Sequence, residues 1–360
     1  MPALSEPMQI FTGMYVVSLL FALASFVLIA DNRTVDRKAR MVFLFCVVSV
    51  ALVTAFDWIA VTICPQRPEL RLFHVLIMAF TFALAPVLPV AIAHAVFPER
   101  YVRWVVGVLV AQALLEVATI FGGFVFWVDG NNVYHRGPLY AAYMAAYCVS
   151  AVYLSLESIK AGRTYQSVNT VSIVVILLFL IVSVGIQVAN GNVRTSWLAV
   201  QLVLLLYFQF YTEMVLRTDA LTRLLNRHSY EEFLDRPQLP CVVVIIDVNK
   251  FKHVNDTYGH AHGDVCLRTI ALLIRRAFGT AGLCFRTGGD EFTVMVTKRQ
   301  DETETFVSKL NGLIEKARQT DDRLPTVSTG IARASGVGTS IHDAIRQADS
   351  NMYEAKRASR

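Results

Sequence analysis

The sequence predicts a chain in two parts. An α-helical membrane bundle of seven spans covers residues 1–209, a helical linker covers 210–218, and an α+β domain covers 219–360. The first indication is composition, because 55% of the 360 residues are hydrophobic and the mean hydropathy is +0.49, above the usual range of soluble proteins. The second is the distribution of charge. Residues 1–218 hold 13 Lys and Arg and 10 Asp and Glu, whereas the shorter remainder holds 20 and 18. The composition changes near Arg217, which we interpret as the membrane boundary.

The first part contains seven apolar segments of about 20 residues, each long enough to cross a ~30 Å hydrocarbon core as a helix. The leader of the first segment has no Lys or Arg, which argues against a cleaved signal peptide. No Gly or Pro interrupts residues 207–219, so the last span is expected to continue as helix into the second part. The segments are Met8–Ala30, Val42–Ile63, Phe73–Phe97, Trp104–Trp127, Leu139–Ile159, Val168–Ala189 and Ser196–Phe208.

The loops between these segments predict the orientation of the bundle. Loops 1, 3 and 5 hold eight Lys and Arg, and loops 2, 4 and 6 hold four. The positive-inside rule therefore places the N-terminus outside the cell membrane and the C-terminal domain in the cytoplasm.

Two acidic residues inside the spans are candidates for sensing. Intramembrane charge is costly and commonly functional, which draws attention to Asp57 and Glu116. Asp57 lies near a span end and could instead reach water or headgroups. The polar and aromatic loop over residues 127–138 could cap an outer pocket or form a solvated turn. Both alternatives stay open, and the sequence does not identify a signal.

The rest of the composition excludes some functions. No basic stripe with interleaved aromatic residues is present, so nucleic-acid binding is not expected. The six cysteines have no paired spacing and are interpreted as small apolar core residues, not as zinc ligands or disulfides.

The most informative stretch of the second part is Gly288-Gly289-Asp290-Glu291-Phe292. It lies between two strand-like runs, Leu283 to Arg286 and Phe292 to Val296, which predicts a tight hairpin. A continuous apolar run from Cys241 predicts a strand buried on both faces that ends at Asp247. Crowded carboxylates cost free energy unless a cation or a proton-transfer role compensates. Adjacent strand residues point to opposite faces, so Asp290 and Glu291 are not expected to share one role.

Three longer motifs accompany the hairpin. Residues 219–227 read DALTRLLNR, residues 247–264 read DVNKFKHVNDTYGHAHGD, and the tail has the pattern ADxxxYxAKxxxR from Ala348 to Arg360. With these motifs the span 219–360 resembles the GGDEF family of diguanylate cyclases, and departs from it at Arg223, where the family usually has Gly, and at Asn249, where it has Asp. The resemblance implies a ferredoxin-like palm with a mainly antiparallel sheet and flanking helices. The first part loosely resembles the seven-helix sensor regions of some bacterial kinases and cyclases.

The resemblance also implies roles for individual residues. Asp247, the backbone of Val248 and Asp290 would hold one or two Mg²⁺ (or Mn²⁺), with Glu291 the next ligand. Asp290 would take the proton from the attacking hydroxyl, and Lys252 would neutralise phosphate charge. The residues implied to bind GTP are Asn255 and Asp264 on the guanine, His260 nearby, Lys356 and Arg360 on the triphosphate, and Gly288 and Gly289 in the hairpin.

The activity implied is condensation of two GTP into cyclic di-GMP with release of two pyrophosphates, which requires a homodimer. The family's inhibitory RxxD motif would fall on Gly279 and Gly282, so product feedback through that site is not expected. Two alternatives are a catalytically silent nucleotide-binding receptor and a relaxed cyclase that makes mixed GMP–AMP dinucleotides. An intact Asp247, Lys252 and Asp290 argue against the first alternative, and Asp264 argues against the second.

Overall fold

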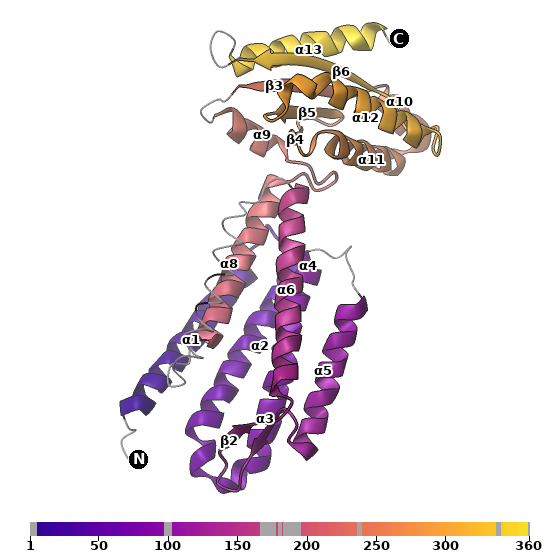
Figure 1. Ribbon diagram of the computed structural model, residues 1–360. Helices are drawn as coiled ribbons and strands as arrows, with labels where there is room; N and C mark the ends of the chain where they lie inside the picture. The colour runs from indigo at the N-terminus through magenta and orange to yellow at the C-terminus, as the bar shows by residue number, and fades with distance from the viewer. Residues whose placement is uncertain are drawn as a thin grey trace. The chain divides into compact units, whose positions relative to one another are not determined.

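The protein has two compact units (Figure 1). The computed structural model describes residues 6–96, 103–165, 178, 182, 196–235, 240–335 and 340–358. The N-terminal unit comprises residues 1–162 and 169–213, and the C-terminal unit comprises residues 163–168 and 214–360. One division between the units falls inside a single helix, α8 (Ser196–Arg217), which is continuous through the linker predicted from sequence.

The N-terminal unit consists mainly of long apolar helices. Among the described residues, six stretches are long and apolar enough to cross a membrane. Six of the seven predicted spans therefore correspond to such helices, whereas the segment Val168–Ala189 lies outside the described residues apart from Leu178 and Val182. Besides α8, the helices are α1 (Glu6–Asp31), α2 (Arg37–Thr62), α3 (Arg71–Leu84), α4 (Val87–Val96), α5 (Arg103–Gly122) and α6 (Tyr140–Tyr165).

The third predicted span is divided into α3 and α4. The helix ends at Leu84 and resumes at Val87, after Pro86. Pro86 has no backbone N–H to donate, which removes a helical hydrogen bond and explains the interruption, while Ala85 before it keeps helical dihedral angles. The stretch Pro68–Val96 still counts as one candidate span of 29 residues.

The loop between α5 and α6 is a small hairpin. Strands β1 (Phe126–Val128) and β2 (Tyr134–Arg136) pair antiparallel. Phe126 and Val128 are buried, and the ring of Phe126 packs edge-on against Phe82 of α3 at 5.4 Å. Two short 3₁₀ helices, η1 (Cys64–Gln66) and η2 (Pro68–Leu70), connect α2 to α3. The loop left open by the sequence is therefore a hairpin that packs on a core cluster through Val128 and Tyr134, whereas Trp127 and Val133 are exposed.

The C-terminal unit is built on a four-stranded antiparallel sheet with the order β4-β5-β3-β6. The predicted hairpin is formed by β4 (Gly282–Arg286) and β5 (Glu291–Val296), and the predicted buried strand is β3 (Cys241–Val248). The fourth strand is β6 (Val327–Ala334). The helices are α9 (Arg227–Leu234), α10 (Phe251–Tyr258), α11 (His260–Phe278), α12 (Thr303–Arg318) and α13 (Ile341–Ala358), with a short η3 (Gln300–Glu302) before α12.

Helices cover both faces of this sheet (Figure 1). Val242, Val244 and Ile246 of β3 belong to a core cluster with residues of α11 and α12, and Val243 and Ile245 belong to a second cluster with residues of α13. All eight residues of β3 are buried, as its continuous apolar run predicted. The expected antiparallel sheet with flanking helices is confirmed.

Candidate active site

Three carboxylates meet at one end of the sheet. Asp247 near the end of β3 lies opposite Glu291, the first residue of β5, in an antiparallel register that places both side chains on the same face. The backbone N–H of Val248 donates to the carbonyl oxygen of Asp290 at 3.1 Å, which brings the hairpin turn against the end of β3. Glu291 therefore shares the face of Asp247, and Asp290 stands in the turn immediately beside it.

A lysine from the last helix neutralises part of this charge. The Nζ of Lys356 on α13 lies 2.5 Å from Oδ1 of Asp247, whose side chain is only 8% exposed. Partial burial, together with repulsion from Asp247, Asp290 and Asp349, raises the pKa of Glu291 above its usual value, although Lys356 opposes the shift. The site thus concentrates negative charge that a cation would relieve.

The donor set is compatible with a magnesium ion. No group of three or more His, Cys, Asp or Glu side chains that could hold a metal alone occurs within the described parts of the chain. Magnesium usually takes one or two protein carboxylates together with substrate phosphates and water, so a complete protein cage is not required. Asp247 and Asp290, with Glu291 as a third oxygen donor, fit that mode.

The hairpin turn is held in place by Arg286, a residue to which no sequence motif assigns a role. Its Nη1 donates to Oδ1 of Asp219 at 3.0 Å and its Nη2 donates to the carbonyl oxygen of Gly289 at 2.7 Å. Asp219 also caps a turn by accepting from the N–H of Thr222 at 2.8 Å. Burial alone would raise the pKa of Asp219, but the hydrogen bonds from Thr222 and Arg286 lower it overall. One arginine therefore links the start of the domain to the glycine turn.

Asp219 stands at a turn and not at a helix N-terminus. Helix α9 begins at Arg227, with Asn226 as its N-cap. The turn between them needs a left-handed residue, Arg223, at φ 59°. This position is where the family usually has glycine, and the φ value gives the physical reason for that preference.

Glycines also shape the hairpin and the predicted guanine site. A side chain at Gly288 would lie 2.9 Å from an Oε of Glu291, so glycine leaves that carboxylate its room. Gly259, at φ +83°, turns the chain between α10 and α11. A Cβ at Gly263 would lie 1.9 Å from Oδ1 of Asn255, so its absence lets Asn255 pack against the start of α11, next to Asp264.

The other predicted residues are distributed around these groups. Lys252 on α10 and His260 at the start of α11 are exposed, and Asp264 is half-buried. Asn249 has a structural role, because its amide donates to Thr326 Oγ1 at 3.0 Å and its Oδ1 accepts from Ser328 Oγ at 2.8 Å. Arg360 lies outside the described residues.

Beside Glu291 the structure has a cleft of about 300 Å³ that sequence reasoning missed. It lies on the face of the sheet covered by α13. Asp349 belongs to the tail motif, but the spacing of residues in the sequence does not indicate that it lies close to Glu291. The polar residues that line the cleft are Arg227, Tyr230, Glu231, Thr287, Glu291, Thr293, Arg346 and Asp349.

The positions of the inhibitory motif have no room for side chains. A Cβ at Gly282 would lie 2.2 Å from the carbonyl oxygen of Met295 on the adjacent strand, and one at Gly279 would lie 2.5 Å from that of Arg275. Real Cβ atoms do not approach backbone so closely. The local backbone, and not only the residue type, therefore differs from what an Arg and Asp pair would need.

The two acidic residues of the N-terminal unit are both buried. Asp57 on α2 accepts a short hydrogen bond from the hydroxyl of Tyr15. Glu116 on α5 is 1% exposed and accepts from Gln112 Nε2 at 2.6 Å, while its other oxygen has no partner among the described residues. Neither residue is near the candidate active site in sequence, and each belongs to the N-terminal unit.

Comparison with known proteins agrees with the motif analysis. Residues 216–360 match the family model "Diguanylate cyclase, GGDEF domain". The diguanylate cyclases DosC and DgcM of Escherichia coli K12 are 34% identical over 154 residues and 31% identical over 147 residues, covering 39% and 38% of this chain. The chain spans about a third of the length of these curated relatives (33% and 35%).

A solved structure with similarity to this chain is the GGDEF domain of DgcB from Caulobacter crescentus in complex with c-di-GMP. It is 27% identical, covers 40% of this chain and 92% of that chain, and superposes with a TM-score of 0.36. Over residues 216–360, which contain the motifs described above, this chain is therefore similar to the GGDEF domains of diguanylate cyclases.

Proposed function

We propose that the protein is a membrane-bound diguanylate cyclase that condenses two GTP into cyclic di-GMP and two pyrophosphates. The observation that carries the proposal is the convergence of Asp247, Asp290 and Glu291, with Lys356 against Asp247. A cluster of this charge is expected where a cation and a polyphosphate bind together.

Each residue contributes a separate physical effect in this proposal. Asp247, Asp290 and Glu291 would hold one or two Mg²⁺ ions, which would supply Lewis-acid polarisation of the α-phosphate. Lys356, which pairs with Asp247, would also contact the triphosphate. Lys252, exposed on α10, would stabilise phosphate charge that develops in the transition state. Asp290 would accept the proton of the 3′-hydroxyl.

Guanine selectivity would come from Asn255 and Asp264. The Asp264 carboxylate can accept hydrogen bonds from the N–H and NH₂ groups of guanine, whereas adenine presents an acceptor at the equivalent ring nitrogen. A site that leaves buried polar groups unpaired with the wrong substrate discriminates strongly. Each domain would bind one GTP, so two chains would face one another, and proximity of the two nucleotides would supply much of the catalysis.

The proposal includes a location and a mode of control. The apolar helices would span a bacterial inner membrane with the N-terminus outside, as the loop charges predict. A signal received by the N-terminal unit would reach the cyclase through α8, which has no interruption up to Arg217. Protease protection in right-side-out vesicles would test the orientation: a cleaved C-terminal domain would contradict it.

Product feedback through the family's inhibitory motif is not part of the proposal. Gly279 and Gly282 leave no space for the Arg and Asp side chains of that motif. We expect added cyclic di-GMP to compete with GTP at most. Strong non-competitive inhibition of the purified enzyme would contradict this expectation.

The decisive assay incubates the full-length protein with GTP, ATP and Mg²⁺ and identifies the products by mass spectrometry. Cyclic di-GMP alone is the expected product. A mixed GMP–AMP dinucleotide would show that Asp264 does not select guanine. Absence of any product, with GTP still bound, would favour a silent receptor.

A further inference from the structure

The N-terminal unit contains a cavity of about 500 Å³ for which the sequence provided no motif. Side chains from α2, α3, α6 and α8 line it together with the β1–β2 hairpin, and all of them belong to the N-terminal unit. Its volume lies within the range of pockets that bind small organic molecules. The chemistry of its lining indicates which class of ligand it would accept.

The hairpin is fastened over the cavity by one buried asparagine. Asn132 has no exposed surface and adopts a left-handed conformation at φ 61°. Its Nδ2 donates to the carbonyl oxygens of Cys64 at 2.6 Å and Arg67 at 3.0 Å. Its Oδ1 therefore accepts from Nδ1 of His74, at 2.9 Å. The lid is thus a defined part of the structure and fixes the orientation of a ring that lines the cavity.

This hydrogen bond uses Nδ1 of His74 and leaves the other ring nitrogen, Nε2, available. Because Nδ1 carries the proton, Nε2 of the neutral ring is an acceptor. Within the described parts of the chain, the His74 side chain makes no other hydrogen bond. A ligand with a hydroxyl or N–H group can donate to this nitrogen.

Aromatic rings form much of the wall. Phe82 and Tyr143 have ring centroids 4.6 Å apart, and Tyr140 lies 5.8 Å from Tyr143. Trp197 of α8 lines the same cavity. Three tyrosine hydroxyls of the lining have no hydrogen-bond partner among the described residues, those of Tyr140, Tyr143 and Tyr147. Rings favour a flat aromatic ligand by stacking, and the hydroxyls offer donors to its polar group.

The permanently cationic side chain of the lining is Arg136, which is exposed. The guanidinium of Arg136 lies over the ring of Tyr140, 4.8 Å from its centroid, and forms no ion pair within the described ranges. Asp57, the acidic residue of the lining, already accepts the hydroxyl of Tyr15. A carboxylate is the small anion that the planar arginine fork binds most directly. An amine would place a second cation beside Arg136.

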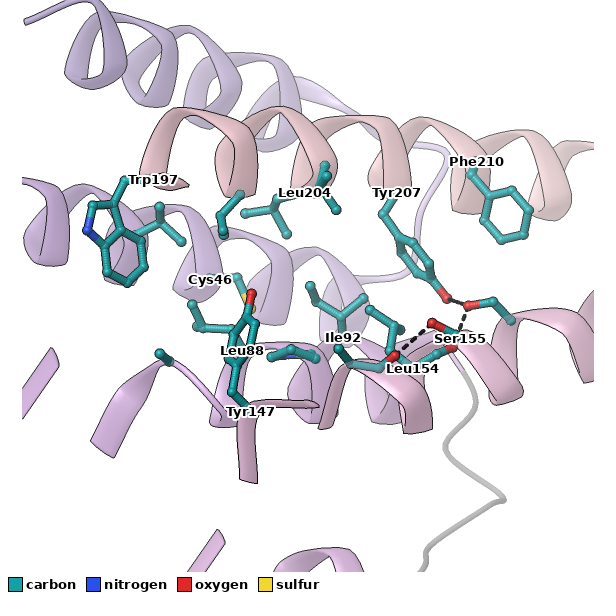
Figure 2. Close-up of a pocket in the computed structure, with 17 residues that line it drawn as sticks. Cys46, Leu88, Ile92, Tyr147, Leu154, Ser155, Trp197, Leu204, Tyr207 and Phe210 are labelled. Atoms are coloured by element: carbon teal, nitrogen blue, oxygen red, sulfur yellow. Dashed lines mark hydrogen bonds between the residues drawn. The ribbon is translucent and has the colours of Figure 1, made fainter. Parts of the chain in front are cut away.

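A smaller cavity of about 80 Å³ adjoins the first and shares Ala85, Tyr147, Trp197 and Val200 with it. Figure 2 shows Trp197 toward one end of it and Tyr207, which bonds to Ser158 at 2.5 Å, toward the other. Its lining is mostly apolar, so the groups that would hold a carboxylate lie in the larger cavity.

We propose that the larger cavity binds a small aromatic carboxylate, with the carboxylate at Arg136 and the ring among Phe82, Tyr143 and Trp197. The tyrosine hydroxyls and His74 would select analogues with further polar substituents. The binding claim does not depend on the proposed cyclase activity, and its test does not use turnover.

The test is calorimetric binding to the full-length protein in lipid nanodiscs. The probes are indole-3-acetate, its amine counterpart tryptamine, and the matched pair phenylacetate and cyclohexylacetate. The two aromatic acids should bind, tryptamine should not, and cyclohexylacetate should bind about two- to tenfold more weakly than phenylacetate, since stacking is lost. Tighter binding of tryptamine than indole-3-acetate, or equal binding of the two acetates of the matched pair, would overturn the assignment.

Variants locate the site. Arg136→Gln should weaken indole-3-acetate binding about tenfold or more, because a charge-assisted hydrogen bond is removed. Arg67→Gln, an exposed arginine outside the lining, is the matched control and should leave binding unchanged. Tyr143→Phe keeps the ring and removes one hydroxyl, so a modest loss is expected in a folded protein. No heat of binding for either aromatic acid up to about 1 mM, or equal affinities of the two arginine variants, would refute the proposal.

Discussion

In the C-terminal unit the functional groups stand at backbone positions with strict conformational demands, whereas in the N-terminal unit they stand on apolar helices at no fixed spacing. Gly259, Gly288 and Arg223 mark turns that only certain residues tolerate, and each belongs to a motif. Asn132 and Arg136 are equally well placed in the structure but belong to no pattern. Motifs therefore report sites built by local geometry, and sites built by helix packing require coordinates.

The largest effect is expected at Asp247. Asp247→Asn removes a metal-binding charge and leaves Lys356 without its partner. Metal-ion stabilisation is worth several kcal/mol of the barrier, so the rate of pyrophosphate release from GTP should fall roughly 10³-fold. Asp322→Asn, at an exposed carboxylate of the same unit, is the control and should retain the wild-type rate. If Asp247→Asn lowered the rate only slightly, the motif residue Asp247 would matter little more to the reaction than the exposed Asp322.

The next effect is expected in the N-terminal unit at Asn132. Asn132→Ala leaves two carbonyl groups and His74 without their hydrogen bonds, which should cost about 3 kcal/mol of hairpin stability. Amide hydrogen exchange over residues 126–136 should accelerate. Asn131→Ala, at the exposed neighbouring position, should not change the exchange. Equal exchange in both variants would mean that the lid is held by other contacts.

Arg286 tests whether the start of the C-terminal domain is coupled to the glycine turn. Arg286→Ala removes one of the donors to Asp219 and the side-chain donor to the Gly289 carbonyl, and should destabilise the domain by about 2 kcal/mol. The turnover number should fall more than the affinity for GTP, because the hairpin loses its support. Arg299→Ala removes an exposed arginine that pairs with Glu302 and should change neither stability nor turnover measurably. Identical melting curves for the two variants would contradict the coupling.

Lys356 should control the pH dependence of activity. Glu291 must be ionised to bind a cation, and its pKa is raised by burial and neighbouring carboxylates, so the rate should decline as pH falls through that raised value. Lys356→Met removes the group that lowers the pKa of Glu291, so the acid limb should move to higher pH. The KM for GTP should rise about tenfold as one charged contact is lost. A limb unmoved, measured from kcat/KM across pH, would argue that Glu291 is not the titrating group.

The smallest effect is expected at Arg223. A non-glycine residue in the left-handed region costs about 1–2 kcal/mol, partly offset in Arg223→Gly by the greater entropy of the unfolded glycine. The substitution should stabilise the C-terminal domain by roughly 0.5–1 kcal/mol in thermal unfolding. Arg223→Ala keeps the unfavourable φ and should give no gain. Stabilisation by alanine as well would indicate that the arginine side chain, not the backbone, is the cost.

How far the sequence could predict this structure follows from the range of the interactions. Strand β3 was predictable because burial on both faces requires a continuous apolar run. The β4–β5 hairpin was predictable because Gly288 and Gly289 mark a turn between two strand-like runs. The pairing of Asp247 with Lys356, 109 residues apart, and the cross-strand match with Glu291 depend on register and helix docking. The interruption before α4 was missed, although Pro86 marks it. No sequence motif indicated that polar side chains would line the cavity of the N-terminal unit.

The most direct test of the central claim compares wild-type protein with Asp290→Asn, in membranes, with GTP and Mg²⁺ as the only substrates. Mass spectrometry should find cyclic di-GMP with two pyrophosphates for each molecule formed by the wild type, and essentially none from the variant at equal protein and equal folding. Absence of cyclic di-GMP from the wild type, or an unchanged yield from Asp290→Asn, would contradict the assignment of this site as a diguanylate cyclase centre.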